Sequence, residues 1–160
     1  MKSFNDALNA YQLGDYPAAV KIWTELAEAG DVRSQFNLGV LYDAGDCVTK
    51  NDWEALFWFR MAAKNNYPEA QFNLAVMLLN GQGGTVNKKE AVRWFEAAAK
   101  LGHVDAAFNL AKSFADGDGV SQDFEQAFFW YKKAAELDHA HSQYVVGVMY
   151  ENGLGVGKDS

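Results

Sequence analysis

The sequence predicts an all-α protein, a right-handed superhelical solenoid of antiparallel helix pairs. Three observations support this fold class. Residues of the same type recur every 36 positions, each period holds two helical patterns, and glycines separate those patterns. A single helix pair of this length cannot bury both of its faces, so neighbouring pairs must stack. Positions in phase include Trp58, Trp94 and Trp130; Leu38, Leu74, Leu110 and Val146; and Gly45, Gly81, Gly117 and Gly153.

The repeat divides the chain into units of a single domain, residues 1–160. We expect a shortened helix pair over 1–30, full repeats over 31–66, 67–102 and 103–138, and the first half of a further repeat over 139–160. Asp159 repeats the position of Asp123, where a further second helix would begin. We expect seven α-helices in this domain and no strand, the last helix running unpaired from about Ala140 to Asn152.

The first helix of each full repeat carries one apolar stripe. In the first repeat it runs from about Asp31 to Ala44, and Gln35, Leu38 and Tyr42 share a face. A glycine follows each such helix, where a left-handed residue satisfies the last carbonyl groups. The counterpart helices start near Pro68, Val104 and Ala140.

The second helix of each repeat begins with a capping signal. Asn51 is followed three residues later by Glu54, and the pattern recurs in the next two repeats, so we expect capping boxes. Small alanines then alternate with a tryptophan on the apolar stripe, which predicts that the tryptophan rings pack in the core. Phe57 and Phe129 lie beside this stripe, and we expect partial exposure of both on the outer face. The other capping pairs are Asn87 with Glu90 and Asp123 with Gln126.

These motifs resemble the Sel-1-like repeat, a longer-looped relative of the tetratricopeptide repeat. The resemblance rests on Gln-Phe-Asn-Leu-Gly at 35–39, Ala-Gln-Phe-Asn-Leu at 70–74, Gly-Asp-Gly-Val at 117–120 and Trp-Tyr-Lys-Lys-Ala-Ala at 130–135. It implies an adaptor or scaffold that grips its partner along a concave surface lined by the first helices. In bacteria such proteins are often secreted or periplasmic, or belong to larger signalling assemblies. The chain departs from the family's disulfide-rich branch because Cys47 is its one cysteine. Cys47 also stands where Gly83 and Gly119 stand, so it is strained if that position needs a positive φ.

The candidate binding groove lies on the first helices, roughly 100° from the core stripe. Four aromatic residues form a ladder that offers apolar contact, and a row of asparagines runs beside them. An asparagine amide can donate to a peptide carbonyl and accept from its N–H, so the row can hold an extended partner. The alternative is that the asparagines bridge adjacent helices. The predicted groove consists of Arg33, Phe36, Asn37, Val40, Phe72, Asn73, Val76, Phe108, Asn109, Lys112, Tyr144 and Val148.

Catalytic motifs are absent from the sequence, so we expect no enzyme and no cofactor. Gly81 to Gly84 lack the lysine of a phosphate loop and follow a helix. His139 and His141 form a His-x-His pair at a helix start, with His103 one repeat earlier, but the pair lacks a third ligand of certain proximity, so we expect solvated helix starts and no metal site. Acidic neighbours of Cys47 disfavour a reactive thiolate. Two alternatives to a scaffold remain: the weak hydrolase activity toward small molecules that the resemblance suggests, and a structural spacer in a larger assembly.

The charge balance disfavours nucleic acid and anionic membranes as partners. The 160 residues include 14 basic and 21 acidic side chains, a formal charge of −7. The chain has neither an apolar run of about 20 residues nor a signal-peptide core, so we expect no membrane insertion. We expect a cytoplasmic protein, or a periplasmic or secreted one if a leader was removed. The unpaired last helix leaves Tyr144 and Val148 open, which favours self-association or a longer native chain.

Overall fold

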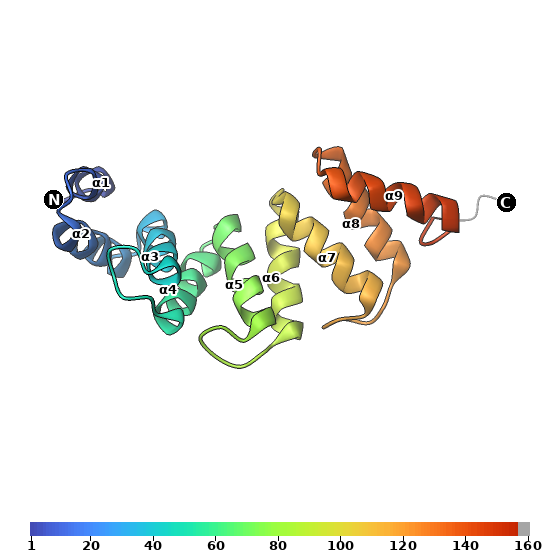
Figure 1. Ribbon diagram of the computed structural model, residues 1–160, viewed down its shortest axis with the longest axis horizontal. Helices are drawn as coiled ribbons and strands as arrows, with labels where there is room; N and C mark the ends of the chain where they lie inside the picture. Colours follow the sequence, from blue (N-terminus) through green and yellow to red (C-terminus); the bar gives the residue numbers. More distant parts are fainter. Residues whose placement is uncertain (157–160) are drawn as a thin grey trace.

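The computed structural model describes residues 1–156, and this part of the chain consists of α-helices joined by turns and loops (Figure 1). Successive helices pack as antiparallel pairs, and α9 follows the last pair. The described residues form α1 (Phe4–Gln12), α2 (Tyr16–Glu28), α3 (Val32–Ala44), α4 (Asp52–Lys64), α5 (Pro68–Asn80), α6 (Lys88–Lys100), α7 (Val104–Asp116), α8 (Phe124–Glu136) and α9 (Ala140–Asn152).

The expected number of seven helices was wrong, because residues 1–156 contain nine. The shortened N-terminal segment forms a complete pair, and each of its helices has its own cap. Ser3 and Asp6 form a reciprocal capping box at α1, while Asp15 accepts a hydrogen bond from the Ala18 N–H at α2. The absence of strands from the described residues and the bounds of α9 agree with the prediction. Asp159 lies outside the described residues.

Helix ends follow the expected glycine chemistry. Gly45, Gly81, Gly117 and Gly153 have φ of 71°, 70°, 67° and 65°. Each is the left-handed residue that ends a first helix. Pro68 occupies the first turn of α5, as its missing N–H allows.

The capping boxes of the second helices are only half formed. The Asn51, Asn87 and Asp123 side chains each cap their helix by accepting a backbone N–H. Their own backbone N–H groups do not bond to the residue three positions on. They donate instead to carbonyls of the preceding helix, at 2.9 Å to Tyr42, 2.8 Å to Leu78 and 2.9 Å to Phe114. The Glu54 and Glu90 carboxylates therefore do not accept these backbone N–H groups, and Glu90 accepts instead from the Asn87 Nδ2 at 3.1 Å.

The core runs along the solenoid between the two layers of helices. Leu38, Leu74 and Leu110 are fully buried, and Phe59 and Phe95 fill the space beside them. Gly39 allows a close approach of two helices, since a Cβ there would lie 2.6 Å from the Phe59 ring. Of the three tryptophans predicted in the core, Trp58 is buried and the other two are half-buried.

Glutamines connect consecutive repeats at the start of the first helices. Gln35 and Gln71 are buried, and their Nε2 atoms donate to the carbonyls of Ala27 and Ala63, at 3.0 and 3.2 Å. Gln143 makes the same bond to Ala135 at 3.1 Å in an exposed setting. These bonds join each first helix to the end of the preceding second helix.

The loop after each first helix packs on the preceding repeat. At Gly83, with φ of 72°, a Cβ would lie 2.4 Å from the Asp52 carbonyl oxygen. A Cβ at Gly119 would lie 2.6 Å from the Lys88 carbonyl oxygen, and a Cβ at Gly155 would likewise clash with the Phe124 carbonyl oxygen. Cys47 occupies the same loop position with φ of 62°, which confirms the expected positive φ at a residue with a Cβ.

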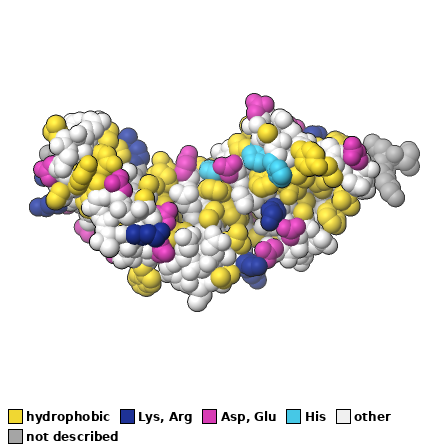
Figure 2. All heavy atoms as spheres, viewed as in Figure 1, with side chains coloured by type: hydrophobic (Ala, Val, Ile, Leu, Met, Phe, Trp, Pro, Cys, Tyr) yellow, Lys and Arg dark blue, Asp and Glu magenta, His cyan; other side chains and the backbone are white. Residues whose placement is uncertain are grey.

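The stacked pairs form an arc with the termini at opposite ends (Figure 1). Its upper side is hollowed, and histidine side chains are visible along that side (Figure 2). None of the described helices has the length and apolar character needed to cross a bilayer.

Candidate protein-binding surface

The predicted aromatic ladder is built from equivalent positions of α3, α5, α7 and α9. Each of its first three rings is half-buried and packs against at least two other rings. Phe36 contacts Phe59 of its own repeat, with ring centroids 5.8 Å apart, and Tyr67 at the entrance of the next repeat, at 4.9 Å. Such contacts between tilted rings stabilise the stack beyond their buried area.

Histidines take the place of Tyr67 farther along the ladder. Phe72 stacks on His103 at 4.6 Å with an interplanar angle of 19°, and also contacts Phe95 at 5.9 Å. Phe108 contacts His139 at 4.8 Å and Tyr131 at 5.6 Å. The surface is therefore a row in which first-helix phenylalanines alternate with rings from the next helix entrance.

The expectation that these histidines are solvated helix starts was wrong for His103 and His139. Both are half-buried N-caps, whose Nδ1 atoms accept the backbone N–H of Ala106 at 3.2 Å and of Ser142 at 3.1 Å. Asp31 caps α3 at the same repeat position. The 36-residue spacing from Asp31 to Tyr67, His103 and His139 was the signal in the sequence that could have predicted the N-cap role of the two histidines. The same spacing could have placed the three rings on this surface. Within residues 1–156, no three His, Cys, Asp or Glu side chains are grouped to hold a metal.

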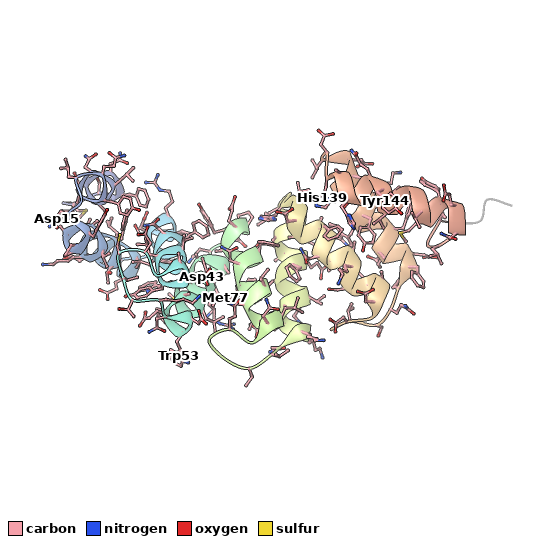
Figure 3. The ribbon with its side chains drawn as sticks, viewed as in Figure 1. Asp15, Asp43, Trp53, Met77, His139 and Tyr144 are labelled. Carbon is pink, nitrogen blue, oxygen red and sulfur yellow. The ribbon has the colours of Figure 1, made fainter. Side chains whose placement is uncertain are left out.

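Tyr144, the last ring of the ladder, is 70% exposed (Figure 3). The three preceding rings pack against Phe59, Phe95 and Tyr131 of their own second helices. In the described chain no second helix covers α9, and a Cβ at Gly147 would meet no atom within 4 Å. Within residues 1–156, Tyr144 is therefore the most exposed ring of the ladder.

The asparagine row differs from residue to residue. The Asn109 Nδ2 donates to the Asp105 carbonyl of its own helix at 2.8 Å. The Asn37 Nδ2 is buried without a hydrogen-bond partner in the described structure. No side-chain hydrogen bond of Asn73 is present among residues 1–156, so the described contacts do not support the alternative in which these amides bridge helices.

The remaining groove residues form the rim of the ladder. The Arg33 guanidinium lies 4.5 Å from the centre of the Phe4 ring, and Lys112 forms an ion pair with Asp116 at 3.5 Å. Val40 is 38% exposed. Val76 and Val148 are half-buried.

Cys47 lies away from the ladder, in the loop after α3. Burial, together with a hydrogen bond to the Asp46 carboxylate at 3.3 Å, raises the pKa of its thiol. A raised pKa favours the thiol over the nucleophilic thiolate. This setting agrees with the expectation drawn from its acidic neighbours.

These features define a helical-repeat solenoid with an aromatic-lined concave side. The sequence matches the Sel1 repeat over residues 32–67, 68–103, 104–139 and 140–160. The chain therefore belongs to the Sel1 repeat family, as the resemblance implied. No curated protein matches the chain in sequence.

Solved structures agree with this assignment. A protective antigen present in uropathogenic Escherichia coli strains, described as displaying an SLR fold, is 33% identical with a TM-score of 0.89. It matches 98% of this chain, which covers 35% of that protein. A Sel1 repeat protein from Oxalobacter formigenes is 32% identical with a TM-score of 0.82, over 98% of this chain and 64% of the other. The chain thus spans about a third of the first relative and less than two thirds of the second.

More distant structures share the fold alone. Cysteine rich protein B of Helicobacter pylori is 17% identical, with a TM-score of 0.63, over 82% of this chain and 94% of that protein.

Proposed function

We propose that this chain is a non-enzymatic scaffold that binds a peptide segment or a protein partner along its concave side. The observation that carries the proposal is the aromatic ladder. Equivalent positions of four consecutive first helices present rings to the same side of the arc, and exposed or half-buried polar groups lie beside them. Membership of the Sel1 repeat family supports a role in protein interactions, since such repeats commonly mediate them.

The ladder suits an extended partner better than a small ligand. Its rings repeat at each helix pair, so a partner segment contacts several repeats at once. Half-buried rings keep fixed positions, which reduces the loss of side-chain entropy on binding. The surplus of acidic residues favours a partner segment that carries basic residues, although Arg33 and Lys112 lie on the rim.

Site-specific photo-crosslinking tests this proposal directly. A photoreactive phenylalanine analogue replaces Tyr144 or Asn73 on the ladder in separate variants. In a matched control it replaces Arg93, which is exposed on the outer side of α6. We expect the ladder positions to capture one common protein in cells, and mass spectrometry to map the crosslinks to one segment of it. Capture only from Arg93 would contradict the proposal.

Substitution then separates binding from folding. Phe72→Ala together with Asn73→Ala should weaken binding of the captured segment by roughly thirtyfold or more, since truncated interface anchors commonly cost about 2 kcal/mol. Phe72 also packs on Phe95 and His103, so thermal unfolding must be measured alongside. Tyr144→Ala is the cleaner variant, because this exposed ring has few contacts to lose.

If the double variant and Tyr144→Ala both retain full affinity, the groove is not the binding site. A chain that captures no partner from any position would instead agree with the role of a structural spacer.

A further inference from the structure

The outer side of the first full repeat contains a cavity of about 480 Å³ between α2 and α4. Four aromatic residues form its walls: Tyr42, Trp53, Phe57 and Trp58. Phe57 and Trp58 meet edge to face, with centroids 4.9 Å apart. Trp53 is 73% exposed and projects from α4 at the lower, outer edge of the arc (Figure 3).

The polar groups of this cavity have a single charge sign. Glu28 of α2 and Glu54 of α4 supply carboxylates, Thr24 supplies a hydroxyl, and no basic side chain of residues 1–156 lines the cavity. Aromatic faces and carboxylates attract an organic cation by different means, the ring quadrupole and full charge. The cavity therefore has the chemistry of an aromatic cage for a cationic group.

The next repeat shows what occupies the equivalent place. Moving 36 residues along the chain, Thr24 becomes Arg60, Glu54 becomes Glu90 and Trp58 becomes Trp94. The Arg60 guanidinium forms an ion pair with the Glu90 carboxylate. The Trp94 Nε1 donates to the same carboxylate at 3.2 Å. Between α4 and α6, Arg60 of the chain itself thus binds the Glu90 carboxylate. Glu54 supplies the equivalent carboxylate between α2 and α4.

The Glu54 carboxylate remains without such a partner. It forms no ion pair and no side-chain hydrogen bond within residues 1–156. The half-formed capping box also leaves it free, because the Asn51 N–H donates to Tyr42. Burial and the nearby Glu54 charge raise the pKa of Tyr42, which is consistent with a carboxylate close to the aromatic wall.

The aromatic wall has an internal precedent as well. Phe129 is the counterpart of Phe57 two repeats on, and the Lys133 ammonium lies 5.6 Å from its ring centre. At the matching position the first repeat has Met61, so Phe57 lacks this lysine contact. Arg60 of the same helix lines a neighbouring cavity with Trp53 and Phe57, but its guanidinium is paired with Glu90. At the interface between α4 and α6, the residues equivalent to Trp53 and Phe57 are Lys89 and Arg93. The cage thus has two aromatic rings, which attract a cation, at the positions where the next interface has two cationic side chains.

We propose that this cavity is a binding site for the guanidinium group of an arginine side chain presented by a partner protein. The partner's arginine takes the place that Arg60 fills in the next repeat, pairing with Glu54 between Trp58 and the rings of Trp53 and Phe57. The site lies on the outer side and does not depend on the concave ladder. Its occupation extends the partner contacts of the scaffold to a second surface.

Nuclear magnetic resonance titration with N-acetyl-arginine amide tests the proposal. The readout is the pair of indole N–H signals of Trp53 and Trp58. We expect both to shift saturably, with a dissociation constant on the order of millimolar for this single residue. N-acetyl-citrulline amide has nearly the same shape without the charge, and should produce no saturable shift. Free L-arginine carries the same guanidinium, and tighter binding of the blocked form would assign the site to arginine within a polypeptide.

Three variants make the test specific. Glu54→Gln should weaken binding about tenfold or more, because it removes the charge-assisted hydrogen bond. Glu136→Gln is the matched control, since Glu136 occupies the position of Glu28 at the α8 end and alters net charge equally. Thr24→Arg should abolish binding by supplying the guanidinium from within the chain, and should shift the Trp58 signal without ligand.

Equal binding of the citrulline compound, or equal effects of Glu54→Gln and Glu136→Gln, would overturn the proposal. The absence of a saturable shift in the unmodified chain would overturn it too. Far-UV circular dichroism verifies that each variant folds. If Thr24→Arg does not fold, the two glutamine variants still test the proposal, because Glu136 is exposed and Glu54 is only half-buried, so neither substitution disturbs the core.

Discussion

At the scale of single residues, buried glutamines hold neighbouring repeats together. We expect Gln71→Ala to lower the free energy of unfolding by about 1–3 kcal/mol, since it removes a buried hydrogen bond and buried methylene groups. Gln143→Ala removes the same bond in an exposed setting and should cost less than about 1 kcal/mol. Urea unfolding of both variants measures the difference. Equal losses would show that burial does not determine the strength of this connection.

Loop glycines act at the same scale through close backbone contact. Gly83→Ala should destabilise the protein by about 3 kcal/mol or more, because the new Cβ meets both an unfavourable positive φ and the Asp52 carbonyl. Gly14→Ala is the control, since Gly14 has φ of 80° and no atom within 4 Å of an added Cβ. It should lose only about 1–2 kcal/mol. Thermal unfolding of the two variants separates backbone strain from the contact between repeats.

At the scale of helices, the ion pair between Arg60 of α4 and Glu90 of α6 makes stability depend on pH. The hydrogen bond from Arg60 lowers the pKa of Glu90 below its ordinary value of 4.5, against the opposing effect of burial. Folding therefore favours the ionised carboxylate. The resulting stabilisation is complete above about pH 4.5 and is lost as the pH falls through the lower folded-state pKa.

Glu90→Gln tests this dependence. We expect the variant to be less stable than the unmodified protein by about 1 kcal/mol at pH 7, with the difference shrinking as the pH falls to about 3. Glu25→Gln, at an exposed position of α2, provides the control. The comparison uses urea midpoints at both pH values. A stability difference that grows toward low pH would contradict the assigned sign.

At the scale of the whole molecule, the open face of α9 is the most exposed apolar part of the ladder. We expect reversible self-association through this face at high concentration, since Tyr144 is 70% exposed and Tyr150 is 55% exposed. Tyr144→Lys should weaken the association measured by sedimentation velocity. Leu13→Lys, which changes an 86% exposed residue at the opposite end, should leave it unchanged. A monomer at every concentration would contradict the prediction.

The 36-residue phase of the sequence was sufficient to determine the fold class, the family, the N-caps of the second helices and the bounds of the last helix. Local rules explain this success. Glycine ends a helix, asparagine or aspartate begins one, and an apolar stripe must be covered, so each repeat specifies its own helices. The expected number of seven helices was too low, although the division into one helix pair, three full repeats and one further helix already implies the nine helices found in residues 1–156.

Only the tertiary structure decided which side chains meet between repeats. His103 and His139 are far in sequence from the phenylalanines that they contact, and Glu90 is 30 residues from Arg60. Periodicity assigns equivalent positions to such residues but does not say which neighbours touch. Contacts between repeats depend on how the helices pack across the stack. Thr24 stands at the repeat position of Arg60, and among the described residues the Glu54 carboxylate has no ion-pair partner of the kind that Glu90 has.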